Sequence, residues 1–451
     1  MLAAKQENYA MRHALAMLAP AMLATAALAL PAVPLAAQTG PTPPVSVDAE
    51  LTALRARAEQ VVALMNGKAE PAEMFTQGFR AAIADAQIKS LSASLTAQFG
   101  PAVEVALLSP PDGTRAALHI RFERGLAKGG IAIDPAEQNR VSELLFTSVD
   151  SLAVAGDTPD KIAADLAALP GSVNAWFAPL DGGAPAISIG ADTRLALGST
   201  FKLYVLAALA QDVKAGRRKW SDVVPLTEKS YPSGKLQDWP KGAPMTLHTL
   251  ASLMISISDN TATDQLIAVL GKERILKLMK DSGHSNPGAN DPFLTTRELF
   301  ILKTMDPDFL NRWRARAIDA MTSAEVLMAV GNPSLDEVNA AFAQGPKAID
   351  IEWFASPADL AKLFAHMRRT ADPKVFDIMA INPSATPAIL ANWDYIGFKG
   401  GSEPGVLNLT WLLRDKAGAW HMLTLGWNNP SAVVDEGKME ALAQRILLLP
   451  R

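Results

Sequence analysis

Cysteine is absent from the chain of 451 residues, and histidine is scarce, with six residues. The first absence excludes disulfide bonds, thiolate metal sites, a cysteine nucleophile and lipid attachment at an N-terminal cysteine. No two histidines stand at the spacing of zinc ligands, so a metal hydrolase would need widely dispersed ligands. We therefore expect neither a metal nor a cofactor.

Charge of one sign is not concentrated anywhere in the chain. The formal net charge is -4, and neither a basic stripe nor an acidic tail is present. The composition therefore gives no support to a nucleic-acid partner. Hydrophobic residues make up 49% of the chain, which is enough for a substantial core. The length suggests two domains or one large one.

A long uncharged stretch, Ala14–Val47, lies near the N-terminus. A basic start, an alanine- and leucine-rich middle and closing small residues follow in the order of a secretory signal. We expect a cleaved signal peptide over residues 1–37 with Met11 as the true start, a flexible lead over 38–48, and export to the periplasm. A permanent membrane anchor is the alternative, but prolines interrupt the apolar run. No other segment could cross a bilayer, so we expect no stable membrane span in the mature form.

The mature chain divides into two units. Residues 49–149 predict a small α+β domain, because two stretches with helical spacing precede an antiparallel meander. The helices are expected at Glu50–Asn66 and Ala72–Phe99, the second broken near Ala86. The β-prone runs are Val103–Leu108, Arg115–Arg121, Gly130–Ile133 and Arg140–Phe146.

Residues 150–451 predict one larger domain whose sheet is assembled from both ends of the segment. Strands at Val173–Phe177 and Ala186–Ile189 precede a helix-rich middle, Ser199–Met379, and a last helix is expected at Ala432–Leu448. The other expected elements are a helix at Thr158–Leu169 and strands at Trp393–Lys399, Val406–Arg414 and His421–Trp427.

The central motif is Ser199-Thr200-Phe201-Lys202, which follows the turn-permitting Gly198. A serine and a lysine three residues apart share one face of a helix, so the amine can reach the hydroxyl. The helix N-terminus also favours developing negative charge. Lysine can activate serine only if burial or a second cation lowers its pKa. A helix cap with a solvated lysine one turn later is the alternative interpretation.

A second motif, Ser258-Asp259-Asn260, follows an expected helix. Ser258 could pass a proton between Lys202 and a leaving amine, while Asn260 could offer its side-chain amide to a substrate amide. An ordinary helix-ending turn is the alternative, because these residue types favour caps and turns.

A third motif, Lys399–Ser402 (KGGS), stands at the end of an expected strand. Its glycines leave room for a substrate to lie along the strand as an added strand. Lys399 would attract a substrate carboxylate and supply a second positive charge near Lys202. The same Lys-Gly-Gly sequence occurs at Lys128–Gly130, where it is interpreted as a turn of the first unit.

The order of the three motifs resembles that of class A β-lactamases and penicillin-binding proteins, over residues 150–451. The sequence around Ser199 and Ser258 resembles that of a two-domain subgroup, whose members carry a small N-terminal NTF2-like domain. The serine hydrolase of the clavulanic-acid gene cluster is one such relative. The resemblance implies an α+β fold class, with a β-lactamase/transpeptidase-like domain (antiparallel sheet plus helical subdomain) preceded by an NTF2-like α+β domain. That fold also occurs in steroid isomerases, but fold does not imply function.

The resemblance also implies a mechanism, in which Ser199 attacks a carbonyl carbon and water later releases the acyl group. The implied catalytic residues are Ser199, Lys202 and Ser258, with an oxyanion hole formed by the backbone N–H groups of Ser199 and Ser402. The partner would be a small-molecule substrate: a β-lactam, peptide or ester with a carboxylate. The implied substrate-binding residues are Asn260, Lys399, Gly400, Gly401 and Ser402.

The sequence departs from the class A pattern where that family holds its deacylating water. The stretch Asp281–Pro292, before the helix start at Thr295, contains no glutamate. We expect Glu298 to be an exposed residue of the first helical turn rather than a base. Without a positioned base the acyl-enzyme could persist, as in penicillin-binding proteins.

Further departures concern the third motif and the chain before it. Gly400 stands where many relatives have a threonine or serine, a hydroxyl that Ser402 could replace. The chain between the second and third motifs is longer than in class A enzymes, and a helical insertion within Asp306–Trp353 could cover the site. Trp239 could line the cleft or simply anchor its loop.

The sequence is compatible with three functions. The first is a serine β-lactamase-like hydrolase that cleaves a β-lactam amide, slowly or well. The second is a D-alanyl-D-alanine carboxypeptidase or a short-chain esterase with the same acyl-serine chemistry. The third, of another class, is a β-lactam-binding protein that is acylated and does not turn over.

Overall fold

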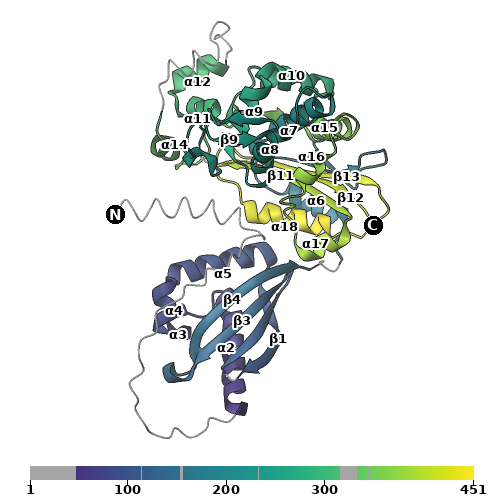
Figure 1. The fold of residues 1–451 in the computed structure, drawn as a ribbon. Coiled ribbons are helices and arrows are strands. Elements are labelled where there is room, and N and C mark those ends of the chain that lie inside the picture. Colours follow the sequence, from purple (N-terminus) through teal and green to yellow (C-terminus); the bar gives the residue numbers. More distant parts are fainter. Residues whose placement is uncertain are drawn as a thin grey trace.

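The computed structural model describes residues 47–450 except 113, 153–155, 232, 315–332 and 344. The expected signal peptide and nearly all of the expected flexible lead lie outside the described residues. Figure 1 shows two units, with α5 (Asp85–Phe99) of the first beside α18 (Glu436–Leu447) of the second. No helix in the described part of the chain is long and apolar enough to cross a membrane.

The first unit is a four-stranded antiparallel sheet in the order β1-β2-β3-β4, with α2 (Val47–Met65) packed across it. Alternate residues of β2 are buried, among them Leu118, Ile120 and Phe122, and they join Leu54 of α2 in one core. The expected broken helix at 72–99 is three helices. The bounds are α3 Pro71–Met74, α4 Gln77–Ala82, β1 Ala102–Asp112, β2 Arg115–Phe122, β3 Gly125–Asp134 and β4 Arg140–Ser151.

The segment Lys128–Gly130 is not the turn that the sequence suggested. It lies in the middle of β3, where a bulge between Lys128 and Gly129 shifts the register against β4. A Cβ on Gly129 would lie 1.8 Å from the carbonyl oxygen of Leu145. Glycine is therefore required by the close approach of a neighbouring strand and not by a chain reversal.

A five-stranded antiparallel sheet, in the order β11-β12-β13-β5-β6, forms the centre of the second unit. Its strands come from both ends of the unit, as the sequence predicted, and Ser172 in β5 pairs with Asn428 in β13. Among the described strands, β11 pairs only with β12 and so lies at the edge. The bounds are β5 Ser172–Pro179, β6 Ile187–Ile189, β11 Tyr395–Glu403, β12 Val406–Arg414 and β13 Trp420–Asn428.

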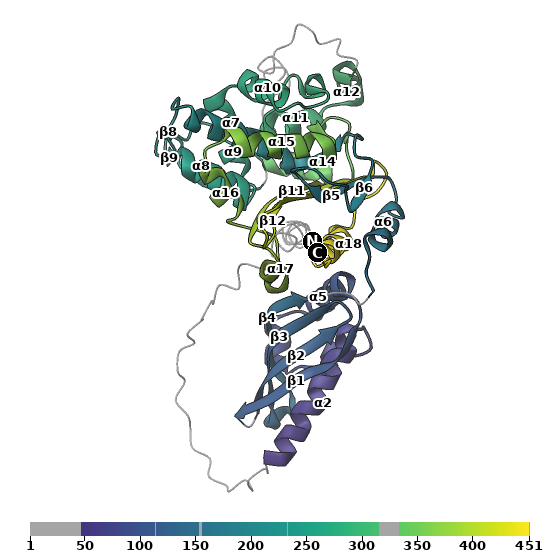
Figure 2. The ribbon, with the colours of Figure 1, turned by 90° about the vertical axis from the view of Figure 1, so that its right-hand side faces the viewer.

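Helices cover both faces of this sheet (Figure 2). On one face α6 (Pro159–Ala167), α17 (Pro387–Asn392) and α18 bury a core that contains Trp411 and Trp427. The other face carries a helical part built around α7 (Lys202–Lys214), which is buried along most of its length. Its other elements are α8 Leu247–Ser256, α9 Asn260–Leu270, α10 Lys272–Asp281, α11 Thr296–Thr304, α12 Pro307–Arg314, α14 Leu335–Phe342, α15 Pro357–Thr370, α16 Lys374–Met379, and the strand pairs β7 Leu195–Ala196 with β10 Phe354–Ala355 and β8 Val223–Pro225 with β9 Pro244–Thr246.

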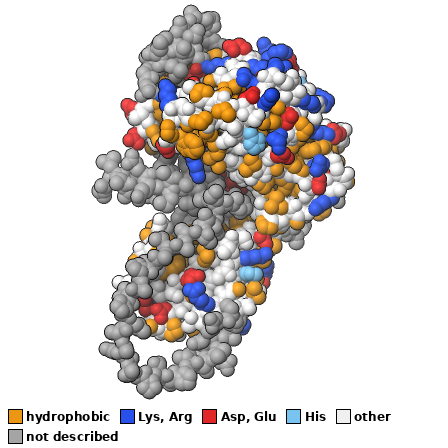
Figure 3. All heavy atoms as spheres, viewed as in Figure 1, with side chains coloured by type: hydrophobic (Ala, Val, Ile, Leu, Met, Phe, Trp, Pro, Cys, Tyr) orange, Lys and Arg blue, Asp and Glu red, His pale blue; other side chains and the backbone are white. Residues whose placement is uncertain are grey.

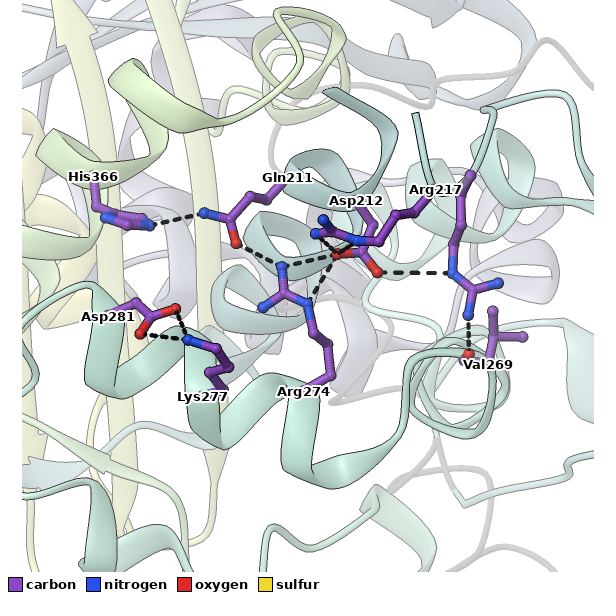
Figure 4. A network of polar contacts seen from close by, with 9 residues as sticks. Gln211, Asp212, Arg217, Val269, Arg274, Lys277, Asp281 and His366 are labelled. Carbon is purple, nitrogen blue, oxygen red and sulfur yellow. Dashed lines mark hydrogen bonds and ion pairs between the residues drawn. The ribbon is translucent and has the colours of Figure 1, made fainter. Parts of the chain in front are cut away.

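A polar network fixes the C-terminal end of α7 (Figure 4). The Asp212 carboxylate accepts hydrogen bonds from Arg217 at 2.6 Å and Arg274 at 2.9 Å, and Gln211 links Arg274 to His366. Lys and Arg side chains gather on the surface over α10 (Figure 3). A cavity of about 590 Å³ opens here. It lies at the opposite end of α7 from the serine–lysine motif.

Several elements end elsewhere than the sequence predicted. β11 does not stop at Lys399 but continues to Glu403, so the KGGS motif is itself part of the edge strand. α18 begins later than expected, after Asp435, whose carboxylate caps it by accepting a bond from Lys438 N. Of the expected insertion Asp306–Trp353, α12 and α14 are described, while residues 315–332 and 344 lie outside the described residues.

Candidate active site

The three motifs meet where α7, the connection between α8 and α9, and β11 come together. Ser199 lies in a 3₁₀ turn, Gly198–Phe201, and Lys202 is the first residue of α7. Ser258 lies between α8 and α9, and Lys399 lies in β11. The hydroxyl of Ser258 joins the last two motifs to the first through hydrogen bonds to both lysines.

The turn that carries Ser199 packs directly against β11. Gly198 has a φ of +50°, and a Cβ there would lie 2.9 Å from Ser402 N. A Cβ on Gly401 would lie 2.3 Å from Ser199 N. Both positions therefore need glycine. Because no side chain separates the two segments, the backbone N–H groups of Ser199 and Ser402 lie near each other, which an oxyanion hole requires.

The Lys202 side chain is fully buried, and its amine has three hydrogen-bond acceptors. These are Ser258 O at 2.7 Å, Ser258 Oγ at 3.0 Å and Asn260 Oδ1 at 2.6 Å. Burial, together with the charge of Lys399, holds the pKa of Lys202 well below its ordinary value. Ser258 adopts a φ of +57°, which is rare for serine and presents both of its oxygens to the lysine.

Lys399 approaches the same hydroxyl from β11. Its amine donates to Ser258 Oγ at 3.0 Å and also to Gly400 O. Burial lowers the pKa of Lys399 to about 7. The Ser258 oxygen thus accepts from two amines, which uses both lone pairs and leaves its own proton free to donate.

The side chain of Asn260 faces inward and is almost fully buried. Its Oδ1 accepts from Lys202, and its Nδ2 donates to Tyr231 O. Its backbone N–H donates to Ser233 O at 3.1 Å. Both ends of the amide are therefore used within the protein, and Asn260 orients Lys202 in this structure.

Two aspartates to which the sequence analysis assigned no role hold the site together. Asp259 accepts three backbone N–H groups, from Lys235, Leu236 and Ala262, and so fixes the start of α9. Asp264, which is buried, accepts from the backbone N–H and hydroxyl of Thr296 and from Arg297 N. Burial raises the pKa of Asp264 to about 6.

Glu298 is not the exposed residue that the sequence suggested. Its side chain is 6% exposed and forms an ion pair with Lys272 at 2.6 Å. It also accepts from Thr295 N at 2.8 Å, which closes a capping box at the start of α11. The partner comes from α10, another element, so the position in the first helical turn could not predict its burial. Glu298 is occupied by these contacts.

The two carboxylates of the stretch Asp281–Pro292 lie on the surface. Asp281 pairs with Lys277 at 2.8 Å, one helical turn away, and Asp291 is exposed. Trp239 is 49% exposed, and its carbonyl oxygen accepts from Lys229. None of the hydrogen bonds of these described residues reaches the Ser199–Lys202–Ser258 cluster.

The fold and site together define the class of protein. An antiparallel sheet with a helical subdomain and a serine–lysine motif is the arrangement of the penicillin-recognising serine hydrolases. In the ranges that the structure describes, no group of three or more His, Cys, Asp or Glu side chains could hold a metal ion. The chain belongs to the β-lactamase enzyme family, whose family model matches residues 158–408.

Solved structures are similar to this chain at low identity. PBP-A is 20% identical with a TM-score of 0.45, and the match covers 64% of this chain and 94% of that one. A β-lactamase from Sphaerobacter thermophilus DSM 20745 is 23% identical with a TM-score of 0.44, over 65% of this chain and 98% of that one. A β-lactamase from Burkholderia ambifaria is 16% identical with a TM-score of 0.43, and the match covers 63% of this chain and 96% of that one. Curated proteins give no match.

Proposed function

We propose that the protein is a serine β-lactamase-like hydrolase in which Ser199 is the nucleophile, Lys202 the base and Ser258 the proton relay. One observation carries the proposal: two buried lysine amines bond the same hydroxyl beside the turn of Ser199. Two like charges held this close in a buried site repel each other, and burial disfavours both. A neutral Lys202 is the consequence: it has two N–H groups to share among its three oxygen neighbours and a lone pair that can accept a proton.

In acylation, Lys202 takes the proton of Ser199 Oγ while that oxygen attacks the carbonyl carbon of an amide or ester. The charge that develops on the carbonyl oxygen is met by the backbone N–H groups of Ser199 and Ser402. As the carbon–nitrogen bond breaks, Ser258 donates its proton to the departing nitrogen and regains one from Lys202. The product is an ester of Ser199.

The substrate that fits this site carries a carboxylate. Lys399 is a buried cation at the free edge of β11, and Ser402, on the same strand, is exposed. Gly400 and Gly401 add no side-chain bulk, so an extended substrate can pair with the strand edge. A β-lactam with its carboxylate near Lys399 meets these requirements, and so does a peptide C-terminus.

Release of the acyl group is the slow step of the proposed reaction. Glu298 is bonded to Lys272, and the carboxylates of Asp281 and Asp291 are at the surface. This favours a second candidate function, a β-lactam-binding protein that is acylated at Ser199 and turns over slowly. A D-alanyl-D-alanine carboxypeptidase or an esterase would use the same acylation step with another leaving group.

Acylation and turnover can be measured separately on the purified protein. Nitrocefin, a fluorescent penicillin and a nitrophenyl ester serve as substrates for the parent, Ser199→Ala, and Ser188→Ala, an exposed serine of β6, as the matched control. Steady nitrocefin hydrolysis supports the hydrolase, ester hydrolysis alone supports the esterase, and labelling in a single equivalent without turnover supports the binding protein. If Ser199→Ala reacts like the parent in every assay, the proposed nucleophile is wrong.

We further propose that the first unit is an NTF2-like domain and that the protein is exported. Helices followed by a four-stranded antiparallel meander support the first proposal. The N-terminal pattern of the sequence supports the second. N-terminal sequencing of the protein recovered from a periplasmic fraction tests the export proposal, and a start near Gln38 is expected.

A further inference from the structure

A second buried cluster of charged side chains lies at the far end of β11. The amine of Lys303, in α11, is fully buried and contacts Glu352 at 3.2 Å and Glu403 at a shorter distance. The two carboxyl groups thus share one amine, because each contacts it through its Oε1 atom. The second oxygen of Glu352 accepts from Trp353 N at 3.1 Å.

This cluster adjoins both segments that form the oxyanion hole. Glu403 directly follows Ser402 in β11. Glu352 directly precedes Trp353, whose carbonyl oxygen accepts from Leu197 N at 2.9 Å. The Trp353 ring stacks on Phe201 with 3.6 Å between ring centroids. One glutamate is thus next to the second oxyanion donor, and the other is tied to the turn of the nucleophile.

The charges of the cluster favour a proton on one of its carboxyl groups. Two carboxylates facing one ammonium leave one negative charge in excess, which burial disfavours. Burial, with the neighbouring Glu352, raises the pKa of Glu403 to about 8 against the attraction of Lys303. Among the described residues, Asp350 also interacts with Lys303 through its charge, and it forms an ion pair with Arg314.

We propose that protonated Glu403 is a positioning residue, which holds the end of β11 against α11 so that the Ser402 N–H stays beside the Ser199 N–H. The inference rests on the proposed function. Glu403 does not act as a base, because a protonated carboxyl cannot take a proton from water. Loss of its proton places the carboxylates of Glu403 and Glu352 side by side. Glu403 is one residue, about 3.3 Å of strand length, from Ser402. The repulsion then displaces the strand end, and the added charge disfavours the oxyanion.

Glutamine at position 403 separates positioning from base catalysis. Its amide oxygen can accept from Lys303 and its NH₂ can donate to Glu352, as a protonated glutamate does. We expect Glu403→Gln to keep the acylation rate within about threefold at pH 7, whereas Glu403→Ala and Lys303→Met lose roughly tenfold or more, as expected when a buried polar partner is removed. Glu143→Gln, which changes an exposed glutamate of the first unit, is the control.

The pH profile gives the second readout, with labelling by a fluorescent penicillin as the assay. The parent should lose about tenfold in acylation rate above pH 8, and Glu403→Gln should lack this loss, because it has no proton to release there. Lys399 titrates in both proteins, so its effect cancels in the ratio of their acylation rates at each pH. Identical pH profiles of the two proteins, or inactivity of Glu403→Gln in a folded protein, would overturn the inference.

A readout that does not need a substrate keeps the two proposals distinguishable. Amide hydrogen exchange in the peptide that spans β11 should rise in Glu403→Ala and Lys303→Met but stay near the parent level in Glu403→Gln. Thermal melting of each variant checks that it is folded. If the parent is not labelled by penicillin, the proposed function is wrong, while the exchange pattern still decides whether Glu403 positions the strand. Equal exchange in all variants would count against it.

Discussion

The amines of Lys202 and Lys399 donate to one atom, the hydroxyl oxygen of Ser258, each at 3.0 Å. The two lysines come from the start of α7 and from β11. Since the oxygen has two lone pairs, both are filled, and the Ser258 proton is directed away from both amines. A proton donor with a fixed direction is what the departure of a nitrogen leaving group requires.

Ser258→Ala removes this donor and should lower the acylation rate with β-lactams by roughly 10²-fold or more, the usual contribution of a positioned proton donor. Nitrophenyl esters should lose less, because their leaving group needs no proton. Stopped-flow acylation kinetics with both substrates measures the difference. Ser256→Ala, at the end of α8, is the matched control, since its hydroxyl bonds Ser252 O. An equal loss for both substrates would contradict the relay.

Substrate charge and pH should interact through Lys399. Burial sets its pKa at about 7, so it is charged below that pH and neutral above it. Binding of a substrate carboxylate should therefore weaken as the pH rises through 7, while binding of a neutral ester should not change. The KM values of a carboxylate-bearing β-lactam and its methyl ester, compared between pH 6 and 8, test this. Parallel KM profiles would argue against contact of Lys399 with the carboxylate.

The two glycines of the third motif should respond differently to substitution. A Cβ on Gly401 would come within 2.3 Å of backbone atoms of the nucleophile turn, so Gly401→Ala should separate β11 from Ser199 and abolish labelling by penicillin. A Cβ on Gly400 would meet the far end of the Phe398 ring at 2.9 Å, which can rotate away, and Leu409 Cδ2 at an ordinary contact distance of 3.4 Å. Gly400→Ser should stay active, and its new hydroxyl should lower the KM for carboxylate substrates. An active Gly401→Ala variant would disprove the close packing.

Asp264 should contribute to stability in a pH-dependent way. Asp264→Asn places an NH₂ group against a backbone N–H and should cost about 2 kcal/mol at pH 7. The folded-state pKa of about 6 lies above the ordinary 3.8, so the part of the stability that comes from the bound proton is complete below about pH 4 and is lost as the pH rises through 6. The hydrogen bonds from Thr296 N and Arg297 N remain at pH 7. Urea unfolding of both proteins at pH 4 and 7 should therefore show a smaller pH dependence for the variant. An equal pH dependence would refute the assignment.

The sequence predicted the sheet built from both ends of the second unit, because each strand has its own periodicity and turn residues. It also predicted the three motifs, since their residue types stand close together in the chain. It could not predict the burial of Glu298, because the partner, Lys272, lies in another helix. The contacts of Lys303 with Glu352 and Glu403 were hidden for the same reason: their three segments meet only after folding. Two consecutive glycines, Gly129 and Gly130, are typical of a turn. Only the close approach of Leu145 in the folded protein shows that they form a β-bulge instead.

The pairing of β5 with β13 has a consequence for how the protein is made. Ser172 finds its partner, Asn428, only when almost the whole chain exists. During synthesis the central sheet therefore remains incomplete. The helices that precede β11 in the chain then have no finished sheet to pack against. Contacts of such long sequence separation form slowly. If the protein is exported as proposed, the second unit would reach a translocation channel that accepts only unfolded chains before its central sheet has closed.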